Sequence, residues 1–139
     1  MGFVIVPAIL ENLADGALAR RGLLPAGQVR RVEVMDALID PNVPGLLLPA
    51  WVVVALGLEP LRPQPPYTTQ VGRTVRLTVD GRDCVMDVGE VADDSPVVIG
   101  RIPLLATDWV IEPQGERLIG NPDHGGEWRM EVPHAEELK

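Results

Sequence analysis

The sequence predicts a mostly β fold, and three observations lead to that prediction. Apolar residues make up 46% of the 139-residue chain while aromatic residues make up only 4%, so the core must be aliphatic. β-Branched residues pack well on a pleated sheet, and an aliphatic core rich in Val and Ile therefore favours strands. Short apolar runs separated by turn residues follow one another along the chain. One pair of these runs carries a clear hairpin signal.

That hairpin lies in the middle of the chain. Residues 75–79 alternate between apolar and polar side chains, residues 84–88 do the same, and Asp80-Gly81 separates the two runs. An Asp-Gly pair between alternating segments indicates a two-residue β-turn. Cys84, the single cysteine, belongs to the alternation and is interpreted as a small buried hydrophobe rather than a nucleophile.

The remaining elements are shorter and are read from the same signals. Further strands are predicted over residues 29–34, 37–39, 46–48, 97–99, 109–111, 117–119 and 127–132. Residues 50–56 contain no helix breaker and precede Gly57, which predicts a short helix, and residues 103–107 predict a helical turn. Residues 121–126 are expected to form a loop. The chain is expected to be a single domain, residues 1–139.

Charge and composition exclude several classes of function. The formal net charge of −8 leaves no basic surface for phosphates, so no nucleic-acid partner is expected. The most apolar stretch, residues 46–58, is shorter than the roughly 20 residues that a membrane-spanning helix needs. The apolar residues 3–10 lack the basic start of a cleavable signal and include a proline. We therefore expect a cytoplasmic protein with no membrane partner.

Two separated segments carry a resemblance to a known family. Ala37-Leu38-Ile39-Asp40, followed after a gap by Leu46-Leu47-Leu48-Pro49, looks like a catalytic strand and loop. Val97-Val98-Ile99-Gly100-Arg101 looks like the apolar-apolar-Gly strand that precedes a short helix. With a hairpin between them, these segments resemble one subunit of the retropepsin-like aspartic proteases, most clearly over residues 29–122. The small prokaryotic members are the most similar.

The resemblance implies a closed β-barrel of the acid-protease type with one or two short helices. It also implies a homodimer in which each subunit donates Asp40 and the C-terminal strand, residues 127–132, lies at the interface. The two carboxylates would share a proton, one acting as general base on water and the other as acid toward a peptide carbonyl. The substrate or ligand would be a peptide or protein. No cofactor is implied, and Asp123, His124 and His134 lack the spacing of a metal site.

The chain departs from the family pattern in the loop that follows Asp40. Pro41 stands where the family has Ser or Thr, Asn42 stands where it has Gly, and Val43 completes the segment expected to contact substrate. Pro41 has neither a hydroxyl nor an amide hydrogen to bond across a dimer. The segment that would form a flap, residues 59–74, contains four prolines. The sequence thus predicts an aspartic peptidase homologue with impaired or lost activity, or alternatively a non-catalytic module for peptide binding or dimerisation.

Overall fold

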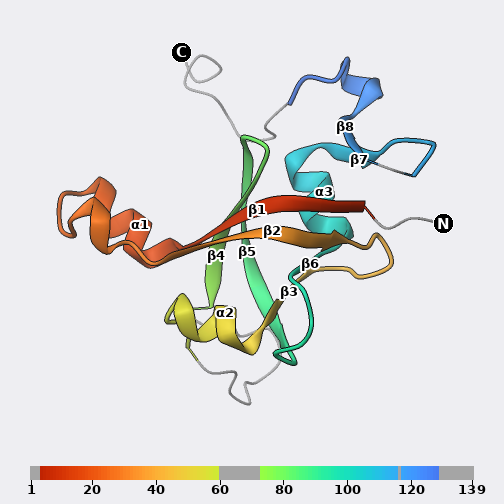
Figure 1. The fold of residues 1–139 in the computed structure, drawn as a ribbon. Helices are drawn as coiled ribbons and strands as arrows, with labels where there is room; N and C mark the ends of the chain where they lie inside the picture. Colours follow the sequence, from red (N-terminus) through yellow and green to blue (C-terminus); the bar gives the residue numbers. More distant parts are fainter. Residues whose placement is uncertain (1–3, 60–72, 116, 129–139) are drawn as a thin grey trace, which may run out of the picture.

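Six strands close into a barrel in the computed structural model, which describes residues 4–59, 73–115 and 117–128. Around the barrel the strands follow the order β1-β2-β6-β3-β5-β4, and β4 pairs back onto β1 (Figure 1). Their bounds are Val4–Asn12 (β1), Arg31–Ile39 (β2), Leu46–Pro49 (β3), Thr74–Val79 (β4), Arg82–Val91 (β5) and Val98–Ile99 (β6). With 41% of the described residues in strands, the predicted mostly β class is confirmed.

Three short α-helices occur in the described residues, so the prediction of one or two was wrong. They are α1 (Leu13–Arg20), α2 (Ala50–Ala55) and α3 (Arg101–Thr107). Helix α1 was not predicted from the sequence. It begins where the Asn12 side chain accepts a hydrogen bond from the Asp15 amide at 3.0 Å. An asparagine at this position satisfies one of the free amides of the first turn. Within the described ranges, no helix is long and apolar enough to cross a membrane.

The predicted β4–β5 hairpin is confirmed together with its turn. Val79 pairs with Arg82, and the two residues between them have positive φ angles of 47° for Asp80 and 83° for Gly81. Two consecutive residues with positive φ define the type I′ turn, whose twist matches that of the flanking strands. A smaller sheet is formed by β7 (Trp109–Ile111) and β8 (Leu118–Gly120), which pair in antiparallel fashion.

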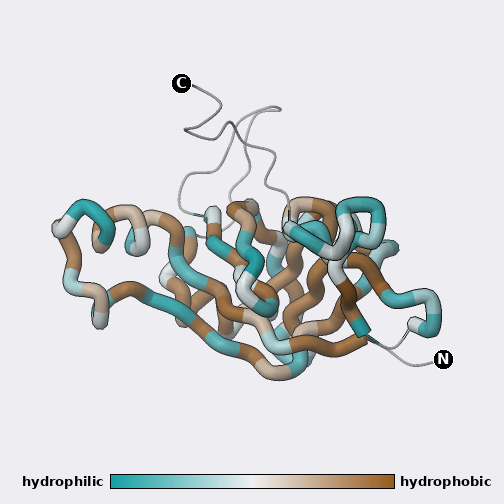
Figure 2. The backbone as a smooth tube through the Cα atoms, turned by 90° about the horizontal axis from the view of Figure 1, so that it is seen from above, coloured by the Kyte–Doolittle hydropathy of each residue, from teal (hydrophilic) through white to brown (hydrophobic). Residues whose placement is uncertain are grey.

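One aliphatic cluster fills the barrel. Its most completely buried side chains are Leu10, Leu46, Leu48, Leu56, Leu77 and Ile99, joined by Val52 and Val75. Helix α2 contributes Val52 and Val53 to this cluster and therefore covers one end of it. Figure 2 shows the apolar segments gathered in the body of the barrel, while α1 and the short 3-10 helix η1 (Ala26–Gln28) extend away from it.

Two strand predictions need correction. Residues 29–34 and 37–39 were expected as separate strands but form the single strand β2, whose Met35 and Asp36 are exposed. The C-terminal strand was expected to start at Glu127, yet neither Glu127 nor Trp128 is in a strand, and residues 129–132 lie outside the described ranges. The predicted loop at residues 121–126 includes a 3-10 helix, η2 (Pro122–His124).

Candidate active site

Strand β6 lies between β2 and β3, so the two segments that carry the family resemblance are direct neighbours (Figure 1). On one side β6 is parallel to β2, with Ile99 opposite Ile39. On the other side it is antiparallel to β3, with Ile99 opposite Leu46. The loop that joins β2 to β3 must therefore pass over the end of β6. Asp40, the predicted catalytic residue, is the first residue of that loop.

Asp40 is positioned by backbone contacts on both of its sides. Its amide donates to the Ile99 carbonyl at 3.0 Å, which continues the β2–β6 ladder by one residue. Its carbonyl accepts from the Val43 amide at 3.1 Å, and its carboxylate Oδ1 accepts from the Asn42 amide at 3.0 Å. The side chain is half-buried. One carboxylate oxygen is thus held by the loop itself, which fixes the orientation of the other.

The loop is also fastened to the start of α3. The carbonyls of Val43, Pro44 and Gly45 accept hydrogen bonds from three consecutive amides, those of Arg101 (2.7 Å), Ile102 (2.9 Å) and Gly100 (2.9 Å). The Arg101 guanidinium adds a contact of 3.1 Å to the Pro41 carbonyl. Every one of these loop groups is an acceptor. Proline at positions 41 and 44 therefore removes no donor that the anchoring of this loop uses.

The predicted substrate-contacting residues lie at the surface. Pro41 and Asn42 are exposed and Val43 is half-buried. Asn42 does not adopt a left-handed backbone, because the non-glycine residues with positive φ in the described chain are Asp80 and Asp108. The replacement of the family's glycine by Asn42 therefore creates no backbone strain in this loop.

Two apolar side chains of α3 are exposed next to the loop. Ile102, whose amide contacts Pro44, has 50% of its surface exposed, and Leu105, one turn later, has 72%. Isolated exposed apolar residues are common on protein surfaces. Here, however, they share one face of a helix that adjoins Asp40, and no sequence motif marked them.

The predicted flap segment falls largely outside the described residues. Residues 60–72 are not described, but both ends of the segment are. The Arg73 guanidinium donates to the carbonyl of Glu59 and, at 3.4 Å, to the carbonyl of Val88. The two ends therefore lie side by side at β5, and the prediction of a shortened flap stays a prediction.

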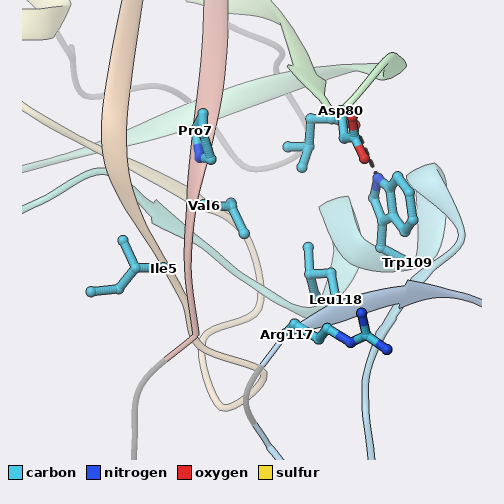
Figure 3. A pocket seen from close by; sticks show the side chains of 8 residues that line it. Ile5, Val6, Pro7, Asp80, Trp109, Arg117 and Leu118 are labelled. Atoms are coloured by element: carbon cyan, nitrogen blue, oxygen red, sulfur yellow. Dashed lines mark hydrogen bonds between the residues drawn. The ribbon is translucent and has the colours of Figure 1, made fainter.

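A separate hollow of about 300 Å³ lies where β1 and β4 diverge (Figure 3). The two strands pair only from Ile9 to Asn12 on β1. The hollow is lined by Ile5, Val6, Pro7, Val79, Asp80, Trp109, Arg117 and Leu118. On one side the Trp109 indole is fixed by donating to the Val79 carbonyl at 3.0 Å. None of the residues of the Asp40 loop lines this hollow.

Other reactive groups do not assemble into a second candidate centre. Burial raises the pKa of the Cys84 thiol to about 11, and the nearby Asp83 carboxylate adds to this effect. Such a thiol stays protonated at neutral pH and is a poor nucleophile. The described ranges contain no group of three or more His, Cys, Asp or Glu side chains that could hold a metal ion. His124 instead faces Asp108, a contact that no spacing rule indicated.

Comparisons with protein-family models, curated proteins and solved structures found no match to this chain.

Proposed function

We propose that the chain is one subunit of a homodimeric retropepsin-like aspartic peptidase homologue, with Asp40 of each subunit facing its counterpart and with catalysis impaired by Pro41. One observation carries the proposal. The segments that resemble the catalytic loop and the apolar-apolar-Gly strand are far apart in sequence, yet β6 lies against β2 and seven hydrogen bonds join the loop to β6, to the start of α3 and to itself. Those bonds keep Asp40 at a defined place at the barrel surface.

The chemistry follows from pairing two such carboxylates. Two carboxylates about 3 Å apart cannot both ionise, so the pair holds one proton. The ionised Asp40 takes a proton from a water that attacks the peptide carbonyl, while its protonated counterpart donates to the carbonyl oxygen. The Asn42 amide holds the Oδ1 atom of each Asp40, which leaves the second oxygen of each carboxylate for these transfers.

Pro41 is the reason to expect impaired activity. In the resembled family the hydroxyl at this position bonds across the dimer, and proline cannot make that bond. The Pro41 carbonyl is itself held by Arg101 within its own subunit. Without a cross-dimer bond, the separation of the two carboxylates is less well fixed. A misplacement of about 1 Å at a reacting centre can cost a hundredfold in rate.

The alternative is a non-catalytic module that binds a peptide or serves only for dimerisation. The exposed Ile102 and Leu105 beside the Asp40 loop favour it, because they offer an apolar contact surface that requires no chemistry. This alternative uses the same fold and the same face of the barrel.

Cleavage of a diverse peptide mixture separates the two functions. The purified chain is incubated with the peptides from acidic to neutral pH, beside Asp40→Asn prepared in the same way. The proposal expects slow cleavage that disappears in Asp40→Asn. Absence of cleavage by a folded dimer would support the non-catalytic module, and a monomer at high concentration would contradict both.

A further inference from the structure

A second network of polar contacts lies at the far end of α3, away from the Asp40 loop. Asp108 caps the helix with a left-handed backbone, at φ 58°, and its side chain is only 9% exposed. The carboxylate accepts a hydrogen bond from Asn121 Nδ2 at 3.1 Å, and its Oδ2 lies 2.5 Å from His124 Nδ1. The Asp108 carbonyl also accepts from the Asn121 amide at 3.1 Å. A single aspartate thus holds the start and the middle of the loop formed by residues 121–126.

Arg82 ties the other end of this loop to the same place. Its guanidinium donates to the carbonyls of Asp108 at 3.0 Å and Gly126 at 2.6 Å, and it stacks 3.9 Å above the Trp109 ring. An arginine remains charged at every physiological pH. The Arg82 contacts are therefore constant, and any response to pH must come from the contact between Asp108 and His124.

Charged groups from three parts of the chain lie around the contact between Asp108 and His124. Asp108 contacts the imidazole from the end of α3. Asp123 and Glu127 carry negative charge on the same segment of chain as His124. Arg82, on β5, supplies the positive charge near Asp108. The hydrogen bond from His124 is the main reason that the pKa of Asp108 is held below its usual value, against the effect of burial. Asp108 accordingly remains an anion through the mildly acidic range.

We propose that Asp108 and His124 form a pH-controlled latch that holds the 121–126 loop on the end of α3. With a protonated imidazole the contact joins a cation to a buried carboxylate, and charge-assisted hydrogen bonds are roughly twice as strong as neutral ones. Histidine is the side chain whose charge most often changes at physiological pH. With a neutral imidazole the ion pair is absent, and the loop is held by the remaining contacts. Trp128 lies just after this loop in the sequence, and its indole donates to the Ala106 carbonyl of α3 at 3.3 Å. The indole therefore also reports whether the loop is held on α3.

Amide hydrogen exchange measured by NMR on the full chain tests the latch. The Gly126 amide donates to the Asn121 carbonyl at 2.9 Å inside the loop, so its protection reports loop opening. After correction for intrinsic exchange, protection of Gly126 should be about fivefold greater near pH 5.5 than near pH 8, as expected when a charged hydrogen bond replaces a neutral one. His124→Gln keeps a side-chain donor but cannot titrate, and it should abolish this difference.

A matched pair of variants separates the latch from a general charge effect. Asp108→Asn removes the anion yet suits the left-handed backbone, because asparagine tolerates that conformation. Asp123→Asn removes the same charge from an exposed neighbour whose carboxylate makes no hydrogen bond in the described part of the chain. The pH difference should vanish in Asp108→Asn and persist in Asp123→Asn. Its persistence in His124→Gln or Asp108→Asn, or its absence from the unmodified chain, would overturn the proposal.

Discussion

Gly100 occupies the point where β6 ends and α3 begins. A Cβ atom placed there would overlap the backbone carbonyl oxygens of Val43 and Gly45. Those oxygens accept the hydrogen bonds that anchor the Asp40 loop, so they cannot withdraw without losing them. The sequence marked Gly100 through its family pattern alone. The physical requirement for glycine depends on a loop that is distant in the sequence.

Gly100→Ala should therefore destabilise the protein by about 2 kcal/mol, the range expected for forcing an extra methyl into a packed site. The free energy of unfolding in urea measures this loss. Gly27→Ala is the matched control, because a Cβ at Gly27 meets nothing within 4 Å. Equal stability of the two variants would show that the loop carbonyls leave room for a Cβ at residue 100.

The residues of the candidate site illustrate what sequence alone could and could not predict. The positions of Asp40 and Gly100 follow from motifs of a few residues each. The hydrogen bond from the Asn42 amide to Asp40 and the contact between Arg101 and Pro41 depend on how two distant segments meet. The pairing of Asp108 with His124 has the same cause, since neither residue belongs to a recognisable pattern.

Among the elements, α1 is held to the residue that precedes β2 by a salt bridge between Asp15 and Arg30. The Asp15 carboxylate accepts from the Arg30 backbone amide at 3.0 Å, from Nε at 2.7 Å and from Nη2 at 3.0 Å. The side-chain hydrogen bonds from Arg30 hold the pKa of Asp15 below its usual value of 3.8, against the effect of burial. A depressed folded-state pKa means that this contribution to stability is present above pH 3.8 and is lost as the pH falls through the folded-state value.

Asp15→Asn should accordingly lower the Tm by a few degrees at pH 7, and the difference from the unmodified protein should shrink as the pH falls well below 3.8. Thermal unfolding followed by circular dichroism at several pH values measures it. Asp36→Asn, an exposed change on β2, should leave the Tm unchanged. A Tm difference for Asp15→Asn that stays constant with pH would contradict a stabilising role for the Asp15–Arg30 salt bridge.

The predicted elements succeeded where the signal is local. The β4–β5 hairpin and helix α2 each depend on neighbouring residues, namely Asp80-Gly81 and the breaker-free run before Gly57. Helix α1 was not predicted, although Asn12 is a favourable N-cap residue. The placement of β6 between β2 and β3 is a long-range pairing that no local pattern encodes.

For the whole molecule, the proposed function requires two copies of the chain. The exposed Ile102 and Leu105 share one face of α3, the helix whose first amides bind the Asp40 loop, and burying them is a reason for a second copy to bind there. Replacing both by aspartate, as Ile102→Asp with Leu105→Asp, should convert the dimer to a monomer in sedimentation velocity. Val54→Asp, at a residue 78% exposed on α2, is the control and should remain dimeric. A monomeric unmodified chain would contradict the proposed dimer.

The proposed function places Asp40 in a working position whose chemistry is limited by Pro41. Cleavage of a peptide mixture by the double variant Pro41→Ser with Asn42→Gly, measured beside the unmodified chain, tests it most directly. The account predicts that restoring the family's residues raises the cleavage rate at least tenfold, by restoring a cross-dimer bond and fixing the carboxylates, and that adding Asp40→Asn abolishes cleavage. A folded, dimeric double variant that cleaves no faster than the unmodified chain, or cleavage that survives Asp40→Asn, would contradict it.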